Sequence, residues 1–86
     1  MKRGDQIAYI PSHAKSTGLK HPDTEFGFVS SISRLDSETI FCRYWLKNSL
    51  GTLRTTANSE ATNTKDLELY KSVPNSTVNE ILKRID

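Results

Sequence analysis

The sequence is poor in the residues that build disulfides, membrane spans and catalytic loops. Its 86 residues include one cysteine, Cys42, so the chain can form neither an internal disulfide nor a zinc site of several thiolates. No apolar run is long enough to cross a membrane, and none of signal-peptide length follows the basic start at Lys2 and Arg3. A small domain without disulfides fits a reducing compartment, so we expect a cytoplasmic protein that binds no membrane.

Candidate catalytic and metal-binding groups are also sparse. None of the four glycines belongs to a phosphate-binding loop. Fragments of a catalytic triad occur, Ser12 with His13 and His21 with Asp23, but nothing spaces a nucleophile, a base and an acid together. His13 and His21, with Asp23 and Glu25, follow no recognised metal-ligand spacing, so we interpret them as solvated loop residues. We therefore expect no enzyme activity, no cofactor and no metal ion.

The composition predicts one small folded domain. Hydrophobic residues make up 35% and charged residues 26%, which is polar for a globular protein but more apolar than a disordered chain. The net charge of +2 arises within residues 1–24, where four basic residues face two acidic ones, because the remaining eight basic and eight acidic residues balance. This mild excess is short of the dense basic patch that is typical of nucleic-acid-binding proteins.

Hydrophobic alternation between turn residues predicts five β-strands. The segments are residues 6–10, 25–32, 39–46, 53–56 and 67–70, of which 53–56 has the weakest pattern. The short connection after the second segment favours an antiparallel hairpin with the third. The polar segment 56–66 is interpreted as a loop or a short helical turn.

The first predicted strand has a simple alternating pattern. Ile7 and Tyr9 alternate with Gln6 and Ala8, and the turn residues Gly4-Asp5 and Pro11-Ser12 lie on either side of the strand.

The third predicted strand, 39–46, has the strongest pattern and divides its side chains between two faces. One face is expected to carry Ile40, Cys42, Tyr44 and Leu46, and to place the Cys42 thiol in the core. The other is expected to carry Phe41, Arg43 and Trp45. Since burial of an unpaired arginine is very costly, this second face is either covered by another element with the charge paired to an acid, or open as a binding platform.

A C-terminal helix is predicted over residues 75–85, after Pro74 ends the last strand. Thr77 and Glu80 have the spacing of a capping box. The apolar residues Val78, Ile81, Leu82 and Ile85 fall on one helical face. A helix of this length is marginal alone, so we expect it to dock this face on the sheet and to cover Phe41 and Trp45 if it packs there.

The pattern of strands resembles the SH3-like small barrels, which include Tudor, KOW and PWWP modules. The similarity lies in Gly-Asp-Gln-Ile at 4–7, Phe-Gly-Phe-Val at 26–29 and Phe-Cys-Arg-Tyr at 41–44, and in a short helical turn before the last strand. The long segment 11–24 matches the first loop of these barrels. The resemblance implies a single SH3-like barrel at residues 1–74. With the C-terminal helix predicted above packed on it at 75–86, we expect a mostly β fold that forms one domain.

A closer similarity links the chain to small uncharacterised proteins encoded by phages and prophages. It is carried by AYIPSHA at 8–14, EFGFV at 25–29, FCRYW at 41–45 and LRTTANSEAT at 53–62. This resemblance implies a phage-type accessory protein that acts in the host cell cytoplasm. It supplies no activity and no site residues.

Candidate binding residues follow from the strand pattern and the loops. Besides the third-strand platform, the polar segment 56–66 is interpreted either as turn chemistry or as a recognition loop, and the segment 11–24 is a second candidate loop. The expected binding residues are Phe41, Arg43, Trp45, Arg54, Asn58, Glu60, His13 and Lys15.

Three functions remain open at this point. The first is a non-enzymatic module that recognises a host or phage protein. The second is a KOW-like or Tudor-like nucleic-acid-binding module, in which basic side chains contact phosphates. The third is an oligomeric enzyme similar to the plasmid-borne dihydrofolate reductase, which is also an SH3-like barrel, although its Val-Gln-Ile-Tyr string is absent here.

Overall fold

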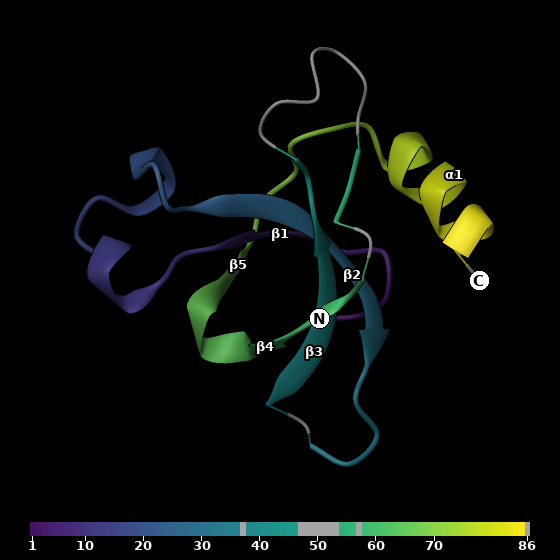
Figure 1. Cartoon of the computed structure of the whole chain (residues 1–86), viewed down its shortest axis with the longest axis horizontal. Coiled ribbons are helices and arrows are strands. Elements are labelled where there is room, and N and C mark those ends of the chain that lie inside the picture. Colours follow the sequence, from purple (N-terminus) through teal and green to yellow (C-terminus); the bar gives the residue numbers. More distant parts are fainter. Residues whose placement is uncertain (37, 47–53, 57, 86) are drawn as a thin grey trace.

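A computed structural model of the chain describes residues 1–36, 38–46, 54–56 and 58–85. Five antiparallel strands form one sheet in the order β4-β3-β2-β1-β5, and one α-helix follows them (Figure 1). The strands are β1 (Gln6–Tyr9), β2 (Glu25–Ile32), β3 (Thr39–Tyr44), β4 (Glu60–Asn63) and β5 (Leu67–Leu69), and the helix is α1 (Asn75–Ile85). The prediction of a mostly β chain with five antiparallel strands and a C-terminal helix is confirmed. The sheet is not closed, because no pairing joins β4 to β5 in the described part of the chain.

The fourth strand is not where the sequence pattern predicts it. Within the predicted segment 53–56, Leu53 lies outside the described residues, and Thr55 forms only an isolated bridge with Trp45. Strand β4 instead lies inside the segment 56–66, which we interpreted as a loop or a short helical turn. A 3-10 turn, η3 (Thr64–Asp66), follows β4 within this segment, so the helical turn expected before the last strand is confirmed. The predicted position of the fourth strand was wrong because pairing with the strong strand β3 overrides the weak β propensity of the sequence Glu-Ala-Thr-Asn.

The sheet has buried side chains on both faces. One cluster contains Ile7, Val29, Ile40, Cys42, Tyr44 and Leu67, which confirms the predicted core position of Cys42. The predicted core position of Leu46 is wrong, because β3 ends at Tyr44 and Leu46 is 44% exposed. Strand β1 is buried on both of its faces, because Gln6 and Ala8 are buried as well as Ile7.

The second cluster forms where α1 packs on the sheet. Phe28 is fully buried against Val78 and Leu82, as the apolar face of the helix predicts. The partly buried residues around them are Trp45, Val73, Ile81 and Ile85. The capping-box interpretation is wrong, because the helix begins at Asn75 and Thr77 already lies within it.

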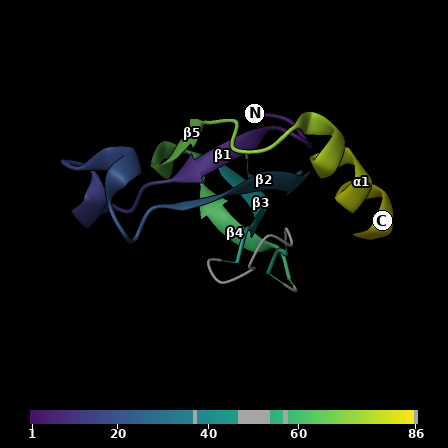
Figure 2. The ribbon, with the colours of Figure 1, turned by 90° about the horizontal axis from the view of Figure 1, so that it is seen from above.

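The segment between β1 and β2 lies at the opposite end of the molecule from α1 (Figures 1 and 2). It contains two 3-10 turns, η1 (Ser12–Ala14) and η2 (Gly18–Lys20). Ala14 is fully buried, and the Thr24 hydroxyl donates a hydrogen bond to the carbonyl of Gly18 at 2.7 Å. The segment is therefore folded upon itself rather than extended. No described helix combines the length and the apolar character that a membrane span requires.

Candidate binding groove

An apolar hollow opens beside the junction of the sheet and the helix. Its volume is about 340 Å³. The start of β2 and the two residues that follow β3 line it, together with the connection from β5 to α1. We call this hollow the groove, and its lining residues are Thr24, Glu25, Phe26, Trp45, Leu46, Ser72 and Val73.

Trp45 lies between the groove and the helix cluster. Its ring packs against Phe28, with centroids 5.4 Å apart and planes inclined by 51°. Its backbone N–H donates to the carbonyl of Phe26 at 2.8 Å, which sets Phe26 beside it in the groove wall. The indole Nε1 is buried and has no hydrogen-bond partner among the described residues. Helix α1 therefore covers part of Trp45, and another part remains on the groove.

The groove wall continues onto exposed apolar surface. The ring of Phe26 packs against Tyr70, with centroids 5.3 Å apart, and the Tyr70 side chain is 41% exposed. Leu46, which also lines the groove, is exposed to a similar degree. Contiguous exposed apolar surface next to a concave site is typical of protein interaction sites.

The predicted platform of Phe41, Arg43 and Trp45 does not stay together as one open face. Trp45 joins the helix cluster, whereas Phe41 is not part of it, so the expected cover over both aromatic rings is formed over Trp45 alone. The Arg43 guanidinium donates to the backbone carbonyl of Thr56 at 3.0 Å, and its Nε is buried without a partner. No described carboxylate forms an ion pair with Arg43, so the expected acidic partner is also absent from the described chain.

The other predicted residues near the third strand are not among the lining residues of the groove. Arg54 and Asn58 are exposed. The backbone carbonyl of Arg54 accepts from Leu46, and that of Asn58 accepts from the Thr56 hydroxyl. Glu60 begins β4 and lines a smaller hollow of about 200 Å³.

That smaller hollow is acidic. Glu25, Glu60 and Asp66 line it together with Tyr9 and Tyr44. Burial is the main cause that raises the pKa of the Tyr44 hydroxyl, which is hydrogen-bonded to the Thr62 hydroxyl at 2.9 Å. Glu25 lines both hollows, so its carboxylate gives the rim of the groove a negative charge that no described basic side chain neutralises.

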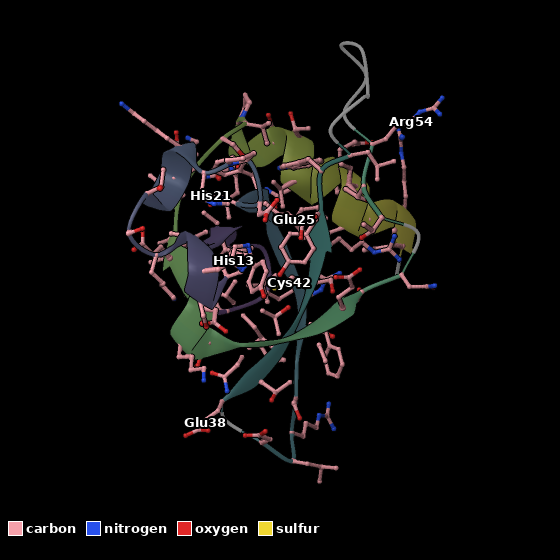
Figure 3. The ribbon with its side chains drawn as sticks, turned by 60° about the vertical axis from the view of Figure 1, so that its left-hand side comes forward. His13, His21, Glu25, Glu38, Cys42 and Arg54 are labelled. Atoms are coloured by element: carbon pink, nitrogen blue, oxygen red, sulfur yellow. The ribbon has the colours of Figure 1, made fainter. Side chains whose placement is uncertain are left out.

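His13 and Lys15 lie in the segment between β1 and β2. The ammonium of Lys15 is 3.3 Å from a carboxylate oxygen of Asp66, which ties this segment to η3. His13 lies beside His21, with ring centroids 5.4 Å apart (Figure 3). The structure therefore brings neither His13 nor Lys15 into the groove.

Sequence reasoning missed most of the groove. Of its lining residues only Trp45 was predicted, while Glu25, Phe26, Leu46 and Val73 were not. One feature of the sequence could have indicated this surface. Phe26 and Phe28 are two residues apart on the same strand, so their rings share a face of the sheet.

We also compared the chain with known families, with curated proteins and with solved structures. None of the three comparisons found a match.

Proposed function

We propose that this chain is a non-enzymatic binding module of phage or prophage type that recognises a protein partner through the groove. The observation that carries the proposal is the apolar wall of Phe26, Trp45 and Leu46 beside the carboxylate of Glu25. Aromatic side chains at the edge of a concave site are frequent anchors of protein interfaces. The occupant that this chemistry favours is an apolar segment carrying a basic side chain.

The finer fold that we propose is the SH3-like barrel. The order β4-β3-β2-β1-β5 and the 3-10 turn between β4 and β5 support it. Further support comes from the hydrogen bonds that link the segment around η3 to the residue after β1 and to the residue before β3. Ile10 donates to the carbonyl of Asp66 at 2.9 Å, and Thr64 donates to that of Glu38 at 2.8 Å.

Electrostatics favours a protein over a nucleic acid at this site. The groove is lined by one carboxylate and by no lysine or arginine. Several basic residues that a phosphate-binding surface would use have other contacts: Arg3 with the carbonyl of Ser30, Lys15 with Asp66, and Arg43 with the carbonyl of Thr56. A phosphate backbone requires free basic groups on one face.

The proposal is tested by selecting peptides from a random library on the immobilised chain. We expect the selected peptides to share apolar side chains next to lysine or arginine. In parallel, labelled single-stranded DNA, double-stranded DNA and RNA are titrated at low salt. Salt-sensitive nucleic-acid binding together with no enriched peptide would overturn the proposal in favour of the nucleic-acid module.

A further inference from the structure

Three side chains with metal-binding atoms converge at the end of the molecule opposite α1. His13 comes from η1, His21 directly follows η2, and Asp23 lies just before β2. One potential ligand atom from each of the three lies within 4.8 Å of the other two. Glu25, the fourth residue of the sequence pattern, is not part of this group.

Direct contacts hold the three side chains together. The imidazole Nε2 of His13 is 2.6 Å from a carboxylate oxygen of Asp23. The backbone N–H of Asp23 donates to Nδ1 of His21 at 3.0 Å. The two imidazole rings meet edge to face, with their planes inclined by 78°.

The backbone around these side chains is also fixed by hydrogen bonds. Ala14 donates to the carbonyl of Pro11 at 2.8 Å, and His21 donates to that of Gly18 at 3.1 Å. Thr24 is buried, and its backbone N–H donates to the carbonyl of His21 at 3.0 Å. The backbone of this segment is therefore already ordered before an ion binds, so less conformational entropy is lost on binding than in a flexible loop.

We propose that His13, His21 and Asp23 form a binding site for a divalent transition-metal ion of the zinc class. Two imidazoles and one carboxylate are ligands that such ions prefer, and the set is smaller and softer than the oxygen cages that bind calcium. The side chains of His13 and Asp23 are 63% and 58% exposed, which leaves room for water to complete the coordination.

Two existing hydrogen bonds must open before an ion can bind. Nδ1 of His21 accepts the backbone N–H of Asp23, so this imidazole must give up that bond and turn to offer a ring nitrogen to the ion, and Nε2 of His13 must separate from the Asp23 carboxylate. Ligand atoms about 2.1 Å from a tetrahedral zinc ion lie about 3.4 Å from one another. The His13 and Asp23 atoms, which are 2.6 Å apart, must therefore separate by less than about 1 Å. Exposed side chains can make this movement by small changes of their side-chain torsions.

The composition of the chain leaves few other side chains that could bind a transition-metal ion and confuse the test. His13 and His21 are the only two histidines, and the single thiol, Cys42, is buried in the core. An untagged chain is titrated with zinc chloride by calorimetry and with cobalt chloride by visible absorption. The variants are His13→Ala, His21→Ala and Asp23→Asn, and Lys20→Ala in η2 is the control within the same segment.

We expect the unaltered chain and Lys20→Ala to bind one ion per chain in a saturable manner. Each ligand variant should weaken binding by about tenfold or more, because even the loss of a group that only supports a ligand commonly costs 10–100-fold. Circular dichroism checks that every variant is folded. Absence of saturable binding to the unaltered chain would overturn the proposal. So would folded His13→Ala and His21→Ala chains that bind the ion as tightly as the unaltered chain.

Discussion

The side-chain amide of Gln6 pairs with the backbone of Val73 through two hydrogen bonds. Its Nε2 donates to the Val73 carbonyl at 2.7 Å, and its Oε1 accepts from the Val73 N–H at 3.0 Å. The same amide also contacts the N–H of Ser72 and the side chain of Asn75, each at 3.0 Å. One buried side chain on β1 therefore fastens the connection to α1, and with it one wall of the groove.

Substitution of Gln6 should loosen this connection. Gln6→Met keeps the length of the side chain but leaves the carbonyl of Val73 and the N–H groups of Ser72 and Val73 without their partner. We expect a loss of about 2–4 kcal/mol in the free energy of unfolding, because each buried polar group without a partner costs about 1–3 kcal/mol. Urea denaturation measures this loss.

A second variant distinguishes the contribution of the Gln6 donor, Nε2, from that of its acceptor, Oε1. Gln6→Glu keeps an acceptor for the two N–H groups but places a carboxylate against the carbonyl of Val73. We expect it to be destabilised at neutral pH and to recover part of the loss in acid, where the protonated carboxyl can donate. A Gln6→Met chain within about 0.5 kcal/mol of the unaltered chain would contradict this account of Gln6.

The packing of α1 should contribute strongly to stability. Leu82 is 5% exposed and lies against Phe28, so Leu82→Ala should lower the free energy of unfolding by about 2–4 kcal/mol. The adjacent exposed residue supplies the control, since Lys83→Ala should change it by less than about 0.5 kcal/mol. Equal stabilities of the two variants in urea, followed by Trp45 fluorescence, would show that the helix is not docked as described.

The strong apolar patterns of the sequence were sufficient to predict most elements of the fold. Strand β3 and helix α1 have clear periods of two and of 3.6 residues, and both form where expected. Strand β4 could not be predicted, because its only apolar residue is Ala61 and its pairing depends on β3. The pattern of residues within a short segment does not show whether a distant strand will pair with it.

The sites were harder to predict than the elements. The role of Gln6 could not be predicted, since nothing in its neighbours indicates that residues 72–75 bind its side chain. The convergence of His13 with Asp23 depends on two 3-10 turns that carry no strong sequence signal. Both contacts join residues that are separated in the sequence, and the spacing of residues along a loop does not show that they meet in the fold.

The buried thiol of Cys42 should make stability fall in alkali. Burial raises the pKa of this thiol from 9.0 to about 11. The folded chain keeps the thiol protonated where the unfolded chain loses its proton, so this contribution is complete below pH 9.0 and is lost as the pH rises to about 11. The raised pKa of Tyr44 acts in the same direction.

A Cys42→Ala chain shows how much of the loss of stability in alkali is due to the thiol and how much to other groups such as Tyr44. Urea denaturation at several pH values between 8 and 11 should give a steeper decline for the unaltered chain than for Cys42→Ala. Parallel declines of the two chains would mean that the thiol ionises as easily in the folded chain as in the unfolded one.

The fluorescence of Trp45 can report whether a peptide is bound in the groove. Trp45 is the only tryptophan of the chain and lines the groove, so a bound peptide should change its fluorescence. Leu46 and Leu35 provide a matched pair of substitutions. Leu46 belongs to the groove, whereas Leu35 is 99% exposed and is not among the lining residues.

The central claim is tested most directly by titrating a library-selected peptide into the unaltered chain, Leu46→Gln and Leu35→Gln, with Trp45 fluorescence as the readout. We predict that Leu35→Gln binds like the unaltered chain. Leu46→Gln should bind at least about tenfold more weakly, or about 1.4 kcal/mol, because a polar amide in the groove must lose its water when an apolar segment docks. Equal dissociation constants for the two variants, with both folded, would contradict a binding site in the groove.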